Sequence, residues 1–214
     1  MLTNKGSIAI VLVAILSSQP SLIQARGDDA SAARVAEHVV CRALFSGDGT
    51  AQVICYVAFA EGLPSRLFAG PPSEATAFFT LRSDTISGEP IVNGNVVVVL
   101  QSAGTYSVYF NSTPHGDWND PDSFSSGQLV ATFKRTPPLL VNVGTMANAF
   151  FSARLLDTNE FAFNGRTFDF RRIVPNGLTW ILTAAANPIP GPPGFVAAQA
   201  FAGSALAIGD AAGR

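Results

Sequence analysis

The sequence predicts an all-β protein, an antiparallel β-sandwich or β-barrel that follows a cleaved N-terminal signal peptide. After residue 25 the chain is a succession of short apolar runs separated by Gly, Pro, Asn and Asp, a pattern typical of all-β domains. Only residues 29–40, which are rich in alanine, favour a helix, and there for one or two turns. The run at 96–100 is continuously apolar, which predicts burial on both faces, whereas 167–171 alternates, which predicts one face in water.

The apolar runs divide the chain into a signal peptide (1–25), a β domain (26–190) and a small, apolar C-terminal tail (191–214). Because the tail begins in a Pro- and Gly-rich stretch and lies at the end of the chain, we expect a docked helix or a poorly ordered segment there. The strands expected in the β domain are residues 37–45, 51–60, 75–82, 95–101, 104–110, 128–135, 139–143, 148–156, 160–164, 166–173 and 178–184.

A weak internal repeat suggests that the β domain contains a duplicated meander. Residues 77–82 (AFFTLR) resemble residues 149–154 (AFFSAR), and an Asn-Gly pair follows each of them, at Asn93-Gly94 and Asn164-Gly165. Asn-Gly favours the type I′ turn that joins two antiparallel strands. The alternative is chance similarity among strands that are rich in Phe and Val.

The first 25 residues have the three parts of a secretory signal peptide. Lys5 lies in a short polar start, residues 7–18 are almost entirely apolar, and Ala25 supplies the small residue at the expected cleavage site. The alternative, a membrane anchor, needs about 20 apolar residues. We therefore expect a secreted or periplasmic protein without an integral membrane segment after the signal is removed. Lys134 is the only lysine after residue 25, an arginine excess that we interpret as a sign of a GC-rich bacterial genome.

The two cysteines, Cys41 and Cys55, are expected to form a disulfide, since an exported chain folds in an oxidising compartment. Asp48-Gly49 between them is a strong hairpin-turn pair, which would place the cysteines opposite each other on two strands. A bridge closing a loop of this length contributes about 3 kcal/mol in the chain-entropy model. The alternative is two buried free thiols.

The composition argues against a nucleic-acid partner. Only 13% of the residues are charged and the formal net charge is −2, whereas proteins that bind nucleic acid obtain much of their affinity from Lys and Arg on phosphates. The Gly-x-Ser-x-Gly, His-Glu-x-x-His, phosphate-loop, dinucleotide-binding and Cys-x-x-Cys motifs do not occur in the sequence.

The densest polar segment, residues 111–127, is the candidate functional loop, because a connection this long between two strands is uncommon unless it has a role. Its aspartates are hard oxygen ligands of the type that Ca²⁺ prefers, although the spacing departs from the EF-hand pattern and we expect no other cofactor. Its tryptophan offers a flat face to a carbohydrate or protein ligand, and its histidine is suited to acid–base chemistry. Asx turns and core capping are the alternative. The candidate ligand-binding residues are His115, Asp117, Trp118, Asp120 and Asp122.

The sequence leaves three functions open. The first is a non-enzymatic binding or structural protein that presents the 111–127 loop on a rigid β scaffold. The second is a secreted hydrolase that acts on a polysaccharide through two carboxylates about 5–10 Å apart in a cleft. The third is a barrel that binds a small apolar ligand, suggested by the 16 Phe against 3 Tyr. A closed barrel with an empty apolar cavity would favour the third, and a filled centre would exclude it.

N-terminal sequencing of the protein recovered from outside the cytosol tests the predicted signal peptide. We expect the sequence to begin at or near Arg26, because cleavage follows the small residue after the apolar segment. An N-terminus that begins at Met1 would contradict the prediction.

Overall fold

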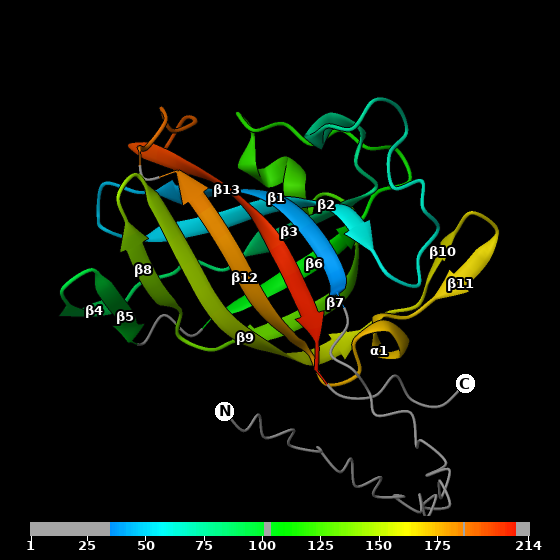
Figure 1. Ribbon diagram of the computed structural model, residues 1–214. Helices are drawn as coiled ribbons and strands as arrows, with labels where there is room; N and C mark the ends of the chain where they lie inside the picture. Colours follow the sequence, from blue (N-terminus) through cyan, green and yellow to red (C-terminus); the bar gives the residue numbers. More distant parts are fainter. Residues whose placement is uncertain (1–34, 101–103, 186, 209–214) are drawn as a thin grey trace, which may run out of the picture. The chain divides into compact units, whose positions relative to one another are not determined.

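The computed structural model describes residues 35–100, 104–185 and 187–208. The predicted signal peptide, residues 1–25, lies outside them. The regular secondary structure of the described chain is nearly all antiparallel β-strand, as the sequence predicts, and eight of the strands form a closed barrel (Figure 1). These strands are β1 (Val35–Phe45), β2 (Ala51–Ala60), β3 (Phe79–Ser83), β6 (Thr105–Phe110), β7 (Gln128–Arg135), β9 (Met146–Thr158), β12 (Leu178–Ala185) and β13 (Ala197–Ala207).

The barrel is closed by one strand that pairs on both sides. The strands follow one another in the order β12-β13-β1-β2-β3-β6-β7-β9, and β9 then pairs with β12 along residues 146–153. Closure gives every strand of the ring a neighbour on each side, so the eight-stranded ring has no open edge strand. The fold is therefore the barrel, not the sandwich, of the two predicted architectures.

A three-stranded extension leaves the barrel at β9. The second half of β9 pairs with β7, but its first half pairs with β8 (Leu139–Val143), and β5 (Val96–Leu100) and β4 (Glu89–Asn93) follow β8 outward. The prediction that residues 96–100 are buried on both faces is wrong, since Val96 to Val98 are only partly buried in this extension. The expected strands do not include β4, which contains Pro90 and occupies the outer edge of the sheet, where a missing backbone N–H is tolerated.

The structure contains two copies of the predicted succession of strand, Asn-Gly hairpin and strand. Strands β3 and β6 pair and enclose the β4–β5 hairpin, while β9 and β12 pair and enclose the hairpin of β10 (Phe161–Phe163) and β11 (Arg166–Phe168). The second hairpin forms its own two-stranded sheet. The predicted strand at 166–173 ends early because Asp169 accepts a hydrogen bond from the backbone N–H of Arg171 at 2.8 Å and caps the short helix α1 (Phe170–Ile173).

The expectation of a helix or tail after residue 191 is wrong. Residues 197–207 form β13, which pairs with β12 on one side and β1 on the other, so the barrel includes them. The segment is rich in Ala and Gly, residues with weak β propensity, and its local pattern therefore hides the strand. At Gly203 the backbone of β12 comes so close that an added Cβ would overlap the carbonyl oxygen of Ile181. Small residues thus permit the tight contact between these two strands.

One end of the barrel is filled by aromatic side chains. Phe79 and Phe110 lie opposite each other on β3 and β6, and the Phe161 and Phe163 rings of β10 stand within 5.6 Å of both, measured between ring centres. At the other end, where β1 turns into β2, several alanines face inward, among them Ala43, Ala51 and Ala184. Two short 3-10 helices, η1 (Glu74–Thr76) and η2 (Pro121–Ser125), lie in the connections outside the ring.

A Gly203→Ala substitution tests the role of β13 in closing the barrel. We expect a loss of about 1–3 kcal/mol in the free energy of unfolding, because the methyl group forces β13 and β12 apart. Gly104→Ala is the matched control, since open space surrounds that position. Urea unfolding of the two variants measures the difference, and equal stability would show that residues 197–207 do not pack as β13.

Candidate ligand-binding cavity

The centre of the barrel is not filled at the end opposite the aromatic cluster. An outer cavity of about 340 Å³ lies among the strand ends and loops there, and an inner cavity of about 60 Å³ lies deeper. The two adjoin, because they share lining residues from four strands. The shared residues are Val53, Arg135, Leu182 and Phe201.

Alternation along the strands explains which side chains face this space. On β1 every second residue points inward, so that Val39 and Cys41 line the inner cavity while Ala43 and Phe45 line the outer one. On β12, Leu182 lines both cavities and Ala184 lines the outer one. The lining is therefore drawn from residues that are far apart in the sequence.

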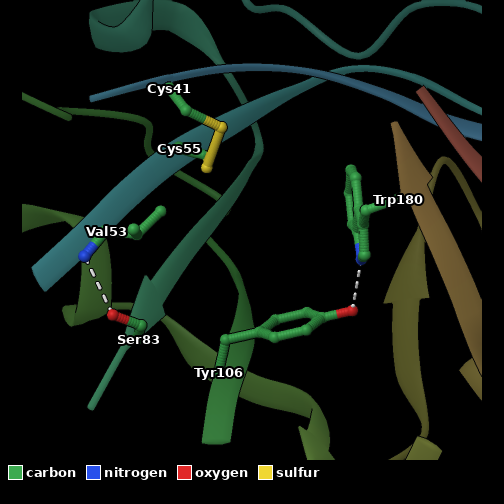
Figure 2. Close-up of a disulfide and its surroundings, with 6 residues drawn as sticks. All are labelled: Cys41, Val53, Cys55, Ser83, Tyr106 and Trp180. Atoms are coloured by element: carbon green, nitrogen blue, oxygen red, sulfur yellow. Dashed lines mark hydrogen bonds between the residues drawn. A yellow bond between two sulfur atoms is a disulfide. The ribbon is translucent and has the colours of Figure 1, made fainter. Parts of the chain in front are cut away.

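The disulfide forms part of the inner wall. Cys41 and Cys55 are bonded and lie directly opposite each other on β1 and β2, which confirms the predicted pairing (Figure 2). The predicted turn is also present, since Gly49 has a φ of 82° and Asp48 accepts a hydrogen bond from the Thr50 backbone N–H at 2.9 Å. The bridge ties the two strands together beside the cavity.

Three polar side chains interrupt the mainly apolar lining of the inner cavity, and the protein supplies partners for Ser83. Its hydroxyl oxygen accepts a hydrogen bond from the Val53 backbone N–H at 2.8 Å (Figure 2) and donates to the carbonyl oxygen of Asp84. This hydroxyl is held in the wall between β2 and β3.

Tyr106 is the second polar group, and it reaches across the interior to Trp180. The indole N–H of Trp180 donates to the Tyr106 hydroxyl at 3.0 Å (Figure 2), and the Tyr106 ring stacks on Phe133 with 4.9 Å between centres. Burial, reinforced by the nearby Glu37 carboxyl, holds the pKa of Tyr106 well above its usual value. The hydroxyl is therefore neutral and able to donate its own hydrogen.

Arg135 is the third polar group and the one charged side chain among the residues that line either cavity. Its Cζ atom lies 5.7 Å from the centre of the Phe151 ring, which itself lines the inner cavity. Burial lowers the pKa of the Arg135 guanidinium, but an arginine remains charged at any physiological pH. The junction of the two cavities thus carries a positive charge.

Glu37 lies in the same inward-facing row of β1, one inward position beyond Val39. Its exposed fraction is 1%, and neither carboxyl oxygen has a hydrogen-bond partner among the described residues. Burial raises its pKa to about 8, so the group is mostly protonated at neutral pH. Sequence analysis missed this residue, although its alternation with Val39, Cys41 and Ala43 was a usable signal.

The polar atoms of the predicted 111–127 loop bind mainly to the loop itself. His115 contacts the carbonyl oxygen of Thr113 at 3.0 Å through Nδ1 and the Ser126 hydroxyl at 2.9 Å through Nε2. Asp117 accepts from the Asn119 backbone N–H at 2.8 Å, and Asp120 accepts from the Asp122 N–H at 3.2 Å.

Contacts with the barrel wall hold the same loop in place. The Asp122 carboxylate pairs with Arg82 of β3. Trp118 packs against Phe124, 4.9 Å between ring centres, and the Arg42 guanidinium lies 4.6 Å from the centre of the Trp118 ring. Phe124 is fully buried against outward-facing side chains of β1 and β2.

The structure thus places the five predicted site residues on the outside of the barrel, and none of them lines the two cavities. In the part of the chain that the structure describes, no three His, Cys, Asp or Glu side chains come together in a way that could hold a metal ion. The loop geometry is that of Asx turns and a capped 3-10 helix.

Comparisons with protein-family models, with curated proteins and with solved structures gave no match. Across the described ranges, no helix has both the length and the apolar character needed to cross a membrane.

The buried Glu37 predicts a stability that falls as the pH rises. From the ordinary glutamate pKa of 4.5 up to about 8, the folded protein keeps a proton that the unfolded chain releases, so that unfolding becomes easier by up to ~1.4 kcal/mol per pH unit. Glu37→Gln should abolish most of this slope and stabilise the protein at neutral pH. Urea unfolding across this pH range measures it, with the exposed Glu89→Gln as control. An unchanged slope in Glu37→Gln would contradict the assignment.

Proposed function

We propose that this protein binds a small, predominantly apolar molecule inside its barrel. The observation that carries the proposal is a closed eight-stranded ring whose centre holds adjoining apolar cavities. Barrels of eight strands are wide enough either to be filled by side chains or to hold one small ligand. Here the side chains leave about 340 Å³ free in the outer cavity alone, within the usual range of small-molecule sites.

The energetics favour an apolar ligand. Most of the lining is contributed by apolar side chains such as Val53, Leu182 and Phe201, while Asn142, Asn148 and Gln199 add polar groups to the outer cavity. A ligand that replaces water in this space removes apolar surface of both partners from solvent, and the gain grows with the area buried.

The wall of the cavity is held in shape before the ligand arrives. Every barrel strand pairs on both sides, and the Cys41–Cys55 bridge joins two strands that line the cavity. Pre-organisation raises affinity because less conformational freedom is lost on binding.

We further propose that this binding takes place outside the cytosol. Disulfides persist in oxidising compartments, and the Cys41–Cys55 bond supports such a location. The signal peptide predicted at residues 1–25 agrees with a secreted or periplasmic protein. No observation supports the alternative function, a hydrolase that acts on a polysaccharide, since the described residues that line the two cavities include no Asp or Glu.

A binding assay with the neutral fluorescent probe N-phenyl-1-naphthylamine tests the proposal. We expect saturable binding at one site and an enhanced fluorescence, as the probe moves from water into the apolar cavity. Ala184→Trp, which places a large side chain into the outer cavity, should weaken binding about tenfold or more, because it excludes the probe from that space.

Ala185→Trp is the matched control, since the neighbouring side chain is exposed and does not line the cavity. Non-saturable binding, or the same loss in both variants, would contradict the proposal. If Trp118→Ala abolished binding while Ala184→Trp did not, the 111–127 loop would be the site instead.

A further inference from the structure

We propose that the ligand is an amphipathic carboxylate of the fatty-acid class, with its carboxylate bound by Arg135 and its apolar chain in the outer cavity. The inference rests on the proposed function and deepens it, because it identifies the head group that the cavity recognises. Three observations support it: the position of Arg135, the charge of the lining and the chemistry of the neighbouring Tyr106.

The position of Arg135 is central to the cavity. It belongs to the lining of the inner and of the outer cavity, and its guanidinium lies over the ring of Phe151 within the barrel. A ligand that enters from the open end therefore meets this group at the point where the wide outer space narrows to about 60 Å³.

The charge of the lining selects an anion. Arg135 is the one charged residue that lines the two cavities, and the buried carboxyl of Glu37 is mainly neutral at physiological pH. Coulomb attraction is stronger in an apolar, water-poor space than in solvent. The binding free energy beside the guanidinium is therefore more favourable for an anionic head group than for a neutral one, whereas a cationic head group is repelled.

Hydrogen-bond geometry favours a carboxylate. The guanidinium presents its N–H groups as a planar fork that matches two carboxylate oxygens. Tyr106 lines the same inner cavity as Arg135. Its oxygen accepts from Trp180, and its own hydrogen can be donated to a carboxylate oxygen of the ligand.

The volume of the outer cavity suggests the length of the chain. At about 340 Å³ it is near the lower end of ordinary ligand sites. A medium-length alkyl chain fits such a space better than the long chain of a membrane lipid. Decanoate and decanol are therefore suitable probes, because they share the chain and differ in the charge of the head group.

The test is displacement of N-phenyl-1-naphthylamine from the native protein by decanoate and by decanol at neutral pH. We expect decanoate to displace the probe at a concentration about tenfold lower than decanol, since a charge-assisted hydrogen bond is stronger than a neutral one. Arg135→Gln should remove this preference, so that decanoate and decanol displace the probe at similar concentrations. Arg154→Gln is the matched control, because it makes the same charge change at an exposed position on β9 outside the two cavities.

A second variant keeps the inference testable if Arg135→Gln does not fold. Arg135→Lys retains the charge without the fork, so we expect it to keep part of the preference. Equal displacement by decanoate and decanol in the native protein, or a preference that survives Arg135→Gln, would overturn the inference. In either case probe binding itself would still support an apolar cavity, whereas a native protein that binds no probe would refute the proposed function.

Discussion

The pairing of β12 with both β9 and β13 is the constraint on which the rest of the structure depends. It closes the ring, so no strand of the barrel leaves a row of unpaired backbone groups. A closed ring also encloses an interior of limited width. Whether that interior is solid or hollow is then decided by the sizes of the inward-facing side chains.

In this protein the inward-facing side chains are graded along the barrel. Phe79 and Phe110, joined by phenylalanines of the β10–β11 hairpin, fill one end. Alanines such as Ala43 and Ala184 face inward at the other end. The cavity follows from this gradient, because small residues on opposite strands cannot meet across a ring of eight strands. The β10–β11 hairpin thus adds aromatic side chains to the end of the barrel opposite the cavity.

The few polar groups in this apolar interior have different environments. The Ser83 hydroxyl accepts a hydrogen bond from a backbone N–H, and the Tyr106 hydroxyl accepts one from the indole of Trp180. These bonds join different strands and so help to fix their arrangement. Among the described residues, the Glu37 carboxyl oxygens have no hydrogen-bond partner, and this group avoids the cost of a buried charge by keeping its proton. Arg135 keeps its charge at any physiological pH, because the intrinsic pKa of a guanidinium is too high for it to lose a proton.

The sequence by itself determined most strands, the turn at Asp48-Gly49 and the disulfide, because each depends on residues that are close in the chain. The sequence also predicted a ligand site in the 111–127 loop, but the polar side chains of this loop bond mainly within the loop. The same residue types form Asx turns as readily as they form a binding site. Only the tertiary structure decided that the barrel closes through β13 and that Val53, Arg135, Leu182 and Phe201 surround one space. The physical reason is that a cavity depends on which residues of distant strands lie opposite each other, and strand register across a closed ring leaves no signal in any single segment.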